Sequence, residues 1–304
     1  MKVVIIGLGS IAQKHIKALF SLGLSIEIYA LRHSRNSQHV EGIIDIYSMD
    51  EILILNPDFI IVSNPTLQHF QTIRELIKFK IPLFIEKPLF SNIGKQEKEL
   101  VDTIVNQNIT TYVACNLRFH KGLIEMKRIL QEKQIQEVNS YCGSFLPEWR
   151  PGVNFREVYS AKAELGGGVH IDLIHELDYL YWIFGEPRNT SHVFTSNSSL
   201  NISSVDYANY LWEYDGFCAN VVLNYYRRDA KRTFEVLTTE GTYLLDLLKN
   251  QIYYQGEMIF SSEQKPEDMY FSQMRYFIEE ILKKGSKFNT IDEANKVLEL
   301  CMQD

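Results

Sequence analysis

Residues 1–23 read MKVVIIGLGSIAQKHIKALFSLG, and this stretch decides the fold of the first part of the chain. A short apolar run at residues 3–6 enters a glycine turn at residues 7–12, which read GLGSIA. The residues that follow have the spacing of an amphipathic helix, with one apolar face made by Ala12, Ile16, Leu19 and Phe20. A strand, a glycine turn and a helix in this order are typical of the start of a dinucleotide-binding unit.

Each small residue of the turn has its own physical role. Gly7 permits the tight turn, Gly9 lets the backbone approach a pyrophosphate, and Ala12 keeps helix and strand close in place of a third glycine. The helix that begins near Ser10 and Ile11 offers free backbone N–H groups to phosphates. The turn therefore predicts cofactor contacts at Gly7, Gly9, Ser10 and Ile11; the alternative is a tight turn that binds no ligand.

The bulk composition restricts the class of protein. The 304 residues are enough for two domains of ordinary size, and 45% hydrophobic with 23% charged residues is typical of a globular protein. The formal net charge of −7 argues against nucleic acid or an anionic membrane as the main partner. A strand that begins at Lys2 leaves no room for a cleavable signal peptide, and no apolar run has membrane-spanning length. Because the four cysteines are widely spaced, we expect a cytoplasmic protein with reduced thiols and no metal site.

The first part of the chain alternates short apolar runs with helical patterns. The runs that read as strands lie at residues 3–6, 26–31, 43–47, 58–62, 82–85 and 111–115. Helical patterns separate most of them, at residues 49–53, 66–78 and 94–106. This alternation is typical of a parallel sheet covered by helices on both faces. We predict an α/β, doubly wound Rossmann domain over residues 1–117.

Residues 118–304 show a different pattern. Closely spaced, alternating strand-like runs separated by turn signals lie at residues 192–195, 207–214, 217–227, 233–239, 242–247 and 251–254. Helical patterns lie at residues 121–131, 169–184, 267–283 and 291–302. We predict an α+β domain over residues 118–304, with a large, mainly antiparallel sheet and helices on one of its faces.

The end of the second predicted strand bears on the choice of cofactor. NAD-selective Rossmann domains usually have an acidic residue here for the ribose 2′-hydroxyl, but residues 31–35 read LRHSR. Arg32, Ser34 and Arg35 suit a 2′-phosphate, because arginine pairs with phosphate through charge-assisted, bidentate hydrogen bonds. We therefore favour NADP over NAD; the alternative is a solvated basic turn.

Two further strand ends carry residues that suit a ligand. The carboxyl ends of parallel strands face the ligand crevice, so Asn64, Pro65 and Thr66 are predicted to contact the cofactor. His69, one turn into the next helix, is predicted either to lie beside the cofactor or to serve only in packing.

The next strand ends in the sequence IEKPL, with Glu86 and Lys87 at its carboxyl end. Pro88 restricts the preceding lysine to an extended backbone. A lysine here points into the crevice and suits hydrogen bonding to a substrate oxygen, or its protonation. We predict that both residues lie at the cofactor; because a Lys-Pro dipeptide by itself is common, the alternative is a turn with no chemical role.

Taken in order, these motifs resemble the Gfo/Idh/MocA family, which includes glucose–fructose oxidoreductase and inositol dehydrogenase. In the first half the resemblance rests on the glycine turn with His15 behind it, the Asn64-Pro65-Thr66 turn with His69, and Glu86-Lys87-Pro88. In the second half it rests on Gly166-Gly167-Gly168, Asp172, His175, Asp178, Trp182 and Gly185. It covers nearly the whole chain.

The resemblance implies that Lys87 is catalytic and works with a catalytic aspartate and histidine, which map onto Asp172 and His175. The family spacing is D-x-x-x-H, whereas this chain has D-x-x-H, so the aspartate is the displaced member. Positions three apart share a helix face, and Asp172 is therefore expected to orient or charge-stabilise His175. Asn116 and Arg118 match substrate-side positions of the family, although Arg118 equally suits a structural ion pair.

Residues 145–161 read FLPEWRPGVNFREVYSA, too aromatic and polar for a plain linker. Trp149, Arg150 and Tyr159, together with Arg156, suit a stacking face and anion contacts for a sugar or a nucleotide-sugar. The segment also resembles that of family members associated with surface polysaccharides. The alternative is a loop packed at a domain or subunit interface.

The predicted function is that of an NAD(P)-dependent oxidoreductase. It would transfer a hydride between the nicotinamide and a hydroxyl or carbonyl carbon of a sugar, nucleotide-sugar or cyclitol. The alternatives are an NAD-retaining glycosidase or epimerase of the same fold and a non-catalytic NADP-binding sensor. The resemblance also implies a homodimer or homotetramer formed through the exposed face of the second sheet.

Overall fold

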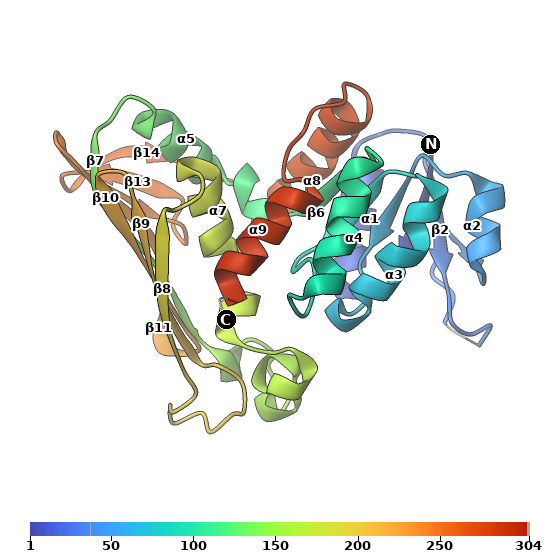
Figure 1. The fold of residues 1–304 in the computed structure, drawn as a ribbon, viewed down its shortest axis with the longest axis horizontal. Coiled ribbons are helices and arrows are strands. Elements are labelled where there is room, and N and C mark those ends of the chain that lie inside the picture. Colours follow the sequence, from blue (N-terminus) through green and yellow to red (C-terminus); the bar gives the residue numbers. More distant parts are fainter. Residues whose placement is uncertain (37, 303–304) are drawn as a thin grey trace. The chain divides into compact units, whose positions relative to one another are not determined.

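The computed structural model describes residues 1–36 and 38–302, and it divides the chain into two compact units (Figure 1). The first unit consists of Met1–Asn116 and Lys265–Leu298. The second consists of Leu117–Gln264 and the described residues from Glu299 onward. Each unit contains one sheet of its own, and the predicted fold class is confirmed.

The first unit contains a six-stranded sheet in the order β3-β2-β1-β4-β5-β6, in which every pair is parallel. Nearly all residues of the four adjacent strands β1, β4, β5 and β6 are buried, as expected for a sheet covered on both faces. The strands are β1 Lys2–Ile6, β2 Glu27–Leu31, β3 Ile43–Ile46, β4 Phe59–Val62, β5 Leu83–Glu86 and β6 Thr111–Ala114.

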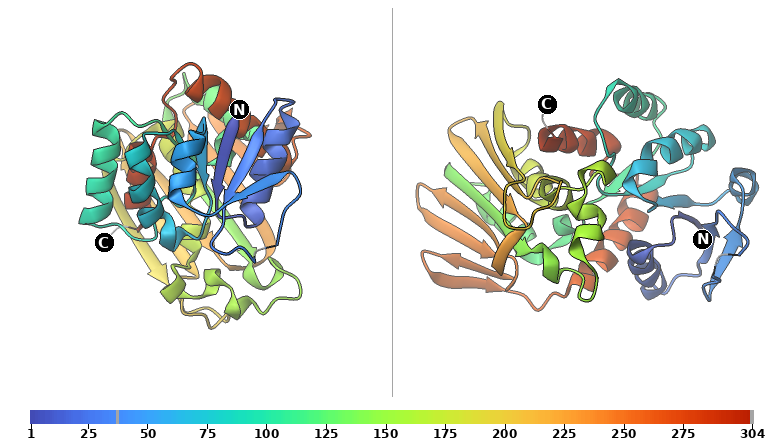
Figure 2. Two further views of the ribbon diagram at one scale, coloured as in Figure 1. Left: turned by 90° about the vertical axis from the view of Figure 1, so that its right-hand side faces the viewer. Right: turned by 90° about the horizontal axis from the view of Figure 1, so that it is seen from below.

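The helices of the first unit connect these parallel strands. The connecting helices are α1 Ser10–Ser21, α2 Met49–Leu55, α3 His69–Leu76 and α4 Lys95–Asn106. In Figures 1 and 2, α3 and α4 lie side by side. The short 3₁₀ helices η1 Thr66–Gln68 and η2 Ile77–Phe79 flank α3. The strand order reverses direction at β1 and β4, so ligand-facing loops are expected at the carboxyl ends of these two strands.

The segment Lys265–Leu298 belongs to the first unit, which differs from the predicted division at residues 117 and 118. The segment contains α8 Pro266–Tyr276, the π-helix η8 Phe277–Leu282 and the start of α9 Ile291–Met302. Phe277 is fully buried and lies edge-on to Phe59 and Phe84, with ring centroids 5.0 and 5.2 Å away. The apolar face of this segment therefore completes the core of the first sheet.

The second unit contains an eight-stranded sheet in the order β14-β13-β12-β11-β7-β10-β9-β8. Only β7 and β10 pair in parallel, and the other neighbours are antiparallel. The strands are β7 Ile135–Phe145, β8 Asn189–Thr195, β9 Tyr207–Tyr214, β10 Phe217–Asn224, β11 Tyr226–Thr238, β12 Gly241–Asp246, β13 Gln251–Tyr254 and β14 Glu257–Ser261.

Helices cover one face of the second sheet (Figure 1). They are α5 Lys121–Leu130, α6 Val169–Asp172 and α7 His175–Phe184. Tyr179 of α7 shows how they pack: it is fully buried, donates or accepts a 2.6 Å hydrogen bond with Ser140 of β7, and lies edge-on to Phe234 of β11. The side chains that alternate with these residues point to the opposite face.

The helix predicted over residues 169–184 is interrupted. α6 ends at Asp172 and α7 begins at His175, and Leu173 between them has φ −100° and ψ 25°. Asp172 and His175 therefore do not lie on one continuous helix, and a shared helix face does not support the expected role of Asp172 at His175.

No helix of the described residues is long and apolar enough to cross a membrane. The four cysteines are free thiols, and Cys218 is the exposed one.

Candidate functional site

The glycine turn of the first unit packs directly against the end of β4. Gly7 has φ +91°, and a Cβ placed on it would lie closer than 3.0 Å to backbone atoms of Ser63 and Asn64. The Ser63 hydroxyl donates a 2.8 Å hydrogen bond to the Gly7 carbonyl. Position 7 therefore requires glycine for two reasons, a left-handed backbone and the absence of a side chain.

The N-terminus of α1 is suited to a phosphate. Gly9 is its N-cap, and no side chain caps this end of the helix. A Cβ on Gly9 would meet no atom within 4 Å, so open space lies in front of the helix end. Uncapped N–H groups and the helix dipole favour an anionic group here. The geometry therefore fits the pyrophosphate of a dinucleotide at Gly9, Ser10 and Ile11.

Asn64 stands where the glycine turn meets β4. Its side-chain amide donates to Thr72 Oγ1 at 2.9 Å and to Gln68 Oε1 at 3.2 Å. Its buried Oδ1 accepts no hydrogen bond from the described residues, which leaves an acceptor for a ligand. Pro65 and Thr66 follow at the start of η1.

His69 has the contacts of a packing residue. It is 1% exposed, and its Nδ1 and Nε2 lie 3.1 and 3.0 Å from the carbonyl oxygens of Leu89 and Asn64. Burial lowers its pKa, which the backbone hydrogen bonds oppose. The structure favours the packing alternative for His69, because its ring connects two ligand-facing loops and is covered by them.

The basic cluster follows β2, beside the carboxyl end of β1. Arg32 donates from Nη2 to the Gln38 carbonyl at 3.0 Å, and its Nη1 lies 3.7 Å from Asp45 Oδ1. Ser34 and Arg35 are exposed, and the Arg35 guanidinium lies 5.1 Å from the centre of the Tyr47 ring. Asp45 partly compensates the charge of Arg32, so Arg35 is the more available cation of the two.

The sequence Glu86-Lys87-Pro88 ends β5 and turns through a cis Lys87–Pro88 peptide bond. Glu86 is 7% exposed, and its Oε1 lies 2.5 Å from Nε2 of the fully buried His15. Its Oε2 accepts a 3.1 Å hydrogen bond from the backbone N–H of Lys87. Lys87 itself is half-buried, at the same edge of the sheet as the glycine turn.

Tyr270 of α8 belongs to the surroundings of this pair. The His15 ring packs edge-on against Phe84 and Tyr270, with ring centroids 4.9 and 5.8 Å away. Burial, followed by the nearby Glu86 carboxylate, raises the pKa of Tyr270 to about 12. The phenol therefore remains neutral across the physiological pH range.

In the second unit, Asp172 is bound by two tyrosines. Its Oδ1 accepts a hydrogen bond from the Tyr159 hydroxyl, and its Oδ2 accepts a 2.5 Å hydrogen bond from the buried Tyr225 hydroxyl. Burial, and then the Asp172 charge, raises the pKa of both phenols. Both tyrosines are therefore donors to a carboxylate at neutral pH.

The glycine run before α6 brings Tyr159 and Asp172 together. A Cβ on Gly167 would lie closer than 3.0 Å to the carbonyl oxygens of Tyr159, Ser160 and Lys162. The Gly167 N–H also donates to the Lys162 carbonyl at 3.0 Å. The run therefore lets the loop containing Tyr159 pack against the residues that open α6.

The remaining predicted residues separate into two groups; Arg118 and His175 belong to the second unit, and Asn116 is the last residue of Met1–Asn116 in the first unit. Arg118 is 1% exposed and donates from Nε and Nη2 to the two carboxylate oxygens of buried Asp178, at 3.0 and 2.8 Å. This geometry favours the structural ion pair for Arg118. His175 and Asn116 are half-buried, the first at the start of α7 and the second at the start of η3 Asn116–Phe119.

The aromatic segment contributes Trp149, Arg150 and Tyr159. Trp149 is 38% exposed, donates to Ser144 Oγ at 2.9 Å, and lies edge-on to Tyr225 with ring centroids 5.3 Å apart. Arg150 is exposed, whereas Arg156 donates to the Leu200 carbonyl at 2.9 Å. Tyr159 bonds to Asp172 directly and Trp149 reaches it through Tyr225, so the three aromatic residues form one cluster with Asp172.

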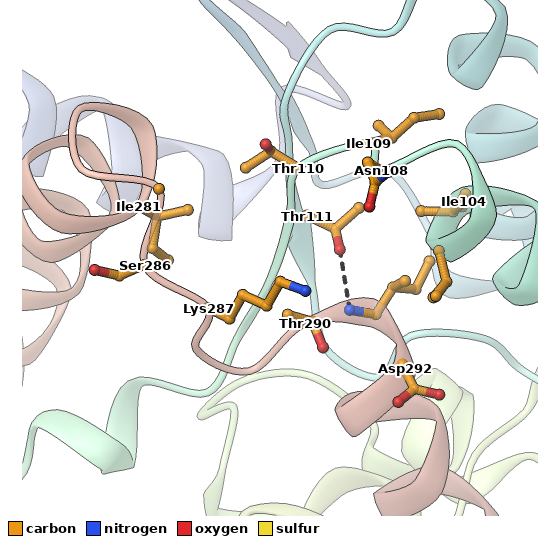
Figure 3. A pocket seen from close by; sticks show the side chains of 13 residues that line it. Ile104, Asn108, Ile109, Thr110, Thr111, Ile281, Ser286, Lys287, Thr290 and Asp292 are labelled. Atoms are coloured by element: carbon orange, nitrogen blue, oxygen red, sulfur yellow. Dashed lines mark hydrogen bonds between the residues drawn. The ribbon is translucent and has the colours of Figure 1, made fainter.

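A cavity of about 310 Å³ opens elsewhere in the first unit (Figure 3). Lys287, Thr290 and Asp292 from the C-terminal segment line it, together with Asn108 and Thr110 before β6. It lies at the amino end of β6, and none of the predicted site residues lines it. Ligands of such sheets bind at the carboxyl ends of the strands, so this cavity is not the cofactor site.

Tyr225 and the role of His15 were not predicted from the sequence. Tyr225 lies between two strands in a region of alternating buried residues, so its sequence context indicates only core packing. His15 carries one signal that was available: it is a histidine on the otherwise apolar face of α1. A buried polar side chain requires a partner, which is Glu86 here.

Comparisons with known proteins match both parts of the chain to one family of oxidoreductases. Residues 1–114 match the family described as "Oxidoreductase family, NAD-binding Rossmann fold", and residues 123–244 match the "GFO/IDH/MocA C-terminal domain". A relative, myo-inositol 2-dehydrogenase of Thermotoga maritima, is 24% identical over 208 residues, which are 66% of this chain. The match spans 59% of the length of that relative.

Solved structures share the fold at low sequence identity. UDP-N-acetylglucosamine 3-dehydrogenase GnnA from Acidithiobacillus ferrooxidans is 17% identical with a TM-score of 0.78, and the match covers 100% of this chain and 96% of that chain. An oxidoreductase from Agrobacterium radiobacter in complex with NAD+, L-tartaric acid and magnesium is 17% identical with a TM-score of 0.79. That match covers 99% of this chain and 94% of that chain.

The packing of the glycine turn generates a prediction about stability. Replacement Gly7→Ala should lower the free energy of unfolding by about 2 kcal/mol or more, because it adds left-handed strain of about 1 kcal/mol and a steric clash. The matched control is Gly9→Ala, whose Cβ meets no atom and whose φ is −84°. Urea unfolding of the two variants measures the difference, and equal stabilities would contradict the close approach at Gly7.

Proposed function

Because the chain belongs to the Gfo/Idh/MocA family of oxidoreductases, we propose that it is an NAD(P)-dependent dehydrogenase or reductase. It transfers a hydride between the nicotinamide and a CH–OH or carbonyl carbon of a sugar, nucleotide-sugar or cyclitol. The observation that carries this proposal is the carboxyl edge of the first sheet. There the uncapped N-terminus of α1 follows β1, and the turn at Lys87 follows β5. Both strands belong to the same parallel sheet.

The substrate class is supported by the relatives. One relative in sequence is named a myo-inositol 2-dehydrogenase, and one structural neighbour is named a dehydrogenase of a nucleotide-sugar. Both names describe a dehydrogenase. The aromatic cluster around Trp149 is consistent with a ring-shaped substrate, because exposed aromatic faces stack on the apolar faces of sugars and bases.

In the first unit, backbone and side chains bind the dinucleotide. The N–H groups at the start of α1 bind the pyrophosphate, and Gly9 lets it approach. Asn64, Pro65 and Thr66, at the carboxyl end of β4, would hold the cofactor beside the glycine turn. When bound, the nicotinamide supplies the hydride acceptor or donor.

We assign the proton chemistry to Lys87 and His175. During oxidation, the substrate C–H bond breaks as the hydride leaves, the hydroxyl proton passes to His175, and the C–O bond becomes a carbonyl. The Lys87 ammonium donates a hydrogen bond to the same oxygen and stabilises the negative charge that develops on it. The reverse reaction returns the proton from His175 to the carbonyl oxygen.

Asp172 has a role in this proposal, with partners that the sequence did not suggest. Its carboxylate stabilises the positive charge that His175 acquires, while Tyr159 and Tyr225 fix its orientation. Trp149, Arg150, Tyr159 and Asn116 contact the substrate. Arg118 holds α7 in place through its ion pair with Asp178, and we assign it no contact with the substrate.

The cofactor form is proposed from the basic cluster. No acidic residue ends β2, and Ser34 and Arg35 are exposed beside the carboxyl end of β1. These groups suit the 2′-phosphate of NADP, and Arg35 is the better placed of the two arginines because Asp45 accompanies Arg32.

The assignment of Lys87 predicts the effect of its removal. Lys87→Met should lower kcat by roughly 100- to 10,000-fold, because a positioned hydrogen-bond donor to the reacting oxygen is lost. The variant should still bind the reduced cofactor, as measured by the fluorescence of that cofactor. Lys95→Met changes an exposed lysine of the same unit and serves as the control. Unchanged turnover in folded, cofactor-binding Lys87→Met would refute the catalytic role.

The choice of NADP predicts a selective loss of affinity. Arg35→Ala should weaken NADPH binding by about 10-fold or more, since a hydrogen bond between charged groups contributes about 1.5–3 kcal/mol. NADH has no 2′-phosphate, and its affinity should not change. Titration of both nucleotides checks this, with the exposed Arg74→Ala variant as control. Tighter binding of NADH than NADPH by the unmodified protein would overturn the NADP assignment.

We also propose a homodimer or homotetramer formed through the face of the second sheet that α5, α6 and α7 leave open. Along β8 and β9 this face presents Val193 and Leu211, which are 58% and 47% exposed. Contiguous exposed apolar side chains mark interaction surfaces, and these two, on adjacent strands of one face, support the proposed interface.

The open face predicts how one substitution changes the oligomeric state. Leu211→Asp should shift the protein toward monomer, because burying an unpaired carboxylate in an interface is unfavourable. Leu53→Asp, at an exposed leucine of α2, should leave the assembly unchanged. Sedimentation velocity measures both, and a monomeric unmodified protein would exclude the proposed oligomer.

A further inference from the structure

A buried hydrogen-bonded pair joins the two principal motifs of the first unit. His15 lies in α1, directly behind the glycine turn, and Glu86 is the last residue of β5. Their side chains are 0% and 10% exposed, and His15 Nε2 lies 2.5 Å from Glu86 Oε1. Because a carboxylate oxygen only accepts, the imidazole donates from Nε2.

Packing does not require a histidine at this position. The other buried residues of α1 are Ala12, Ile16, Ala18 and Leu19, so His15 is the polar member of an apolar face. Its Nδ1 is buried and has no hydrogen-bond partner among the described residues. An apolar side chain would avoid the cost of that unsatisfied atom, which indicates that the contact with Glu86 has a use of its own.

Glu86 also forms a hydrogen bond with the residue that follows it, Lys87. Its second oxygen, Oε2, accepts the backbone N–H of Lys87 at 3.1 Å. The carboxylate thus bonds to α1 with one oxygen and to the Lys87 backbone with the other. Two hydrogen bonds on different oxygens fix both the position and the rotation of the carboxylate.

We infer that His15 and Glu86 are positioning residues that hold Lys87 in register with the cofactor-binding end of α1. This inference rests on the proposed function, in which α1 binds the pyrophosphate and Lys87 contacts the reacting oxygen. Neither residue touches the substrate in this role. Their effect is on alignment, and a misplacement of about 1 Å at the reacting groups costs on the order of 100-fold in rate.

The test replaces the donor and then restores it. His15→Leu removes the hydrogen bond but keeps an apolar side chain of similar size, and His15→Asn is polar but too short to reach Glu86. His15→Gln provides an amide N–H in place of Nε2–H. Phe84→Leu is the matched control, because Phe84 packs against the His15 ring and takes no part in the hydrogen bonds.

We expect kcat of His15→Leu and His15→Asn to fall by roughly 10- to 100-fold, while the dissociation constant of the reduced cofactor stays within about twofold. His15→Gln should recover most of the lost kcat. Phe84→Leu should lower the urea midpoint and leave kcat of the folded protein nearly unchanged.

Three results would overturn the inference. Unchanged kcat in both His15→Leu and His15→Asn would show that the pair has no positioning role. A fall in kcat with Phe84→Leu as large as that with His15→Leu, or no recovery with His15→Gln, would show a packing effect. Lys87→Met separates this outcome from failure of the proposed function: if that variant keeps full turnover, the catalytic assignment fails, whatever His15 does.

Discussion

The close approach of Gly7 to the end of β4 is the constraint on which the ligand edge of the first unit depends. The glycine lies against the backbone of Ser63 and Asn64, and the Ser63 hydroxyl bonds to its carbonyl. This contact sets where α1 begins relative to the sheet. The direction of α1 in turn places its uncapped N-terminus at the carboxyl ends of the strands and brings His15, one turn and a half later, to Glu86. One steric requirement thus determines the positions of several polar groups.

Local sequence signals were sufficient for the first sheet. Short apolar runs between helical patterns predicted six parallel strands, and their right-handed crossovers leave few possible strand orders. Most of the antiparallel sheet was also predicted, because alternation along β9 to β12 reports one buried and one open face. No predicted run covers β14, which is largely exposed and does not alternate. The membership of Lys265–Leu298 in the first unit was not predicted. An amphipathic pattern shows that a face is buried but does not show against which sheet, and Phe277 meets Phe59 and Phe84 from more than 190 positions away.

Residue type and strand position predicted the candidate site in part. Both identify polar residues near a ligand edge, but they do not separate a residue that faces the ligand from one satisfied by the protein. Arg118 and His69 are of the second kind, since Asp178 accepts the hydrogen bonds of the Arg118 guanidinium and the His69 ring lies between two backbone carbonyls. These partners lie far along the chain or depend on loop conformation, and no local pattern reports them. Arg35 is exposed and Lys87 is half-buried at the carboxyl edge of the first sheet, and both remain candidates for contact with a ligand.

The helix break and the hydrogen bonds from Tyr159 and Tyr225 together explain how the shortened D-x-x-H spacing is accommodated. On one continuous helix, a loss of one residue would rotate Asp172 by about 100° relative to His175. The break at Leu173 removes that geometric dependence, because the two residues lie on separate helices. What then orients Asp172 is the pair of hydroxyls from Tyr159 and Tyr225, which bond to opposite oxygens of its carboxylate. The aromatic loop and the second sheet therefore hold the Asp172 carboxylate in place. For this reason, the number of residues between Asp172 and His175 does not decide whether Asp172 corresponds to the family aspartate.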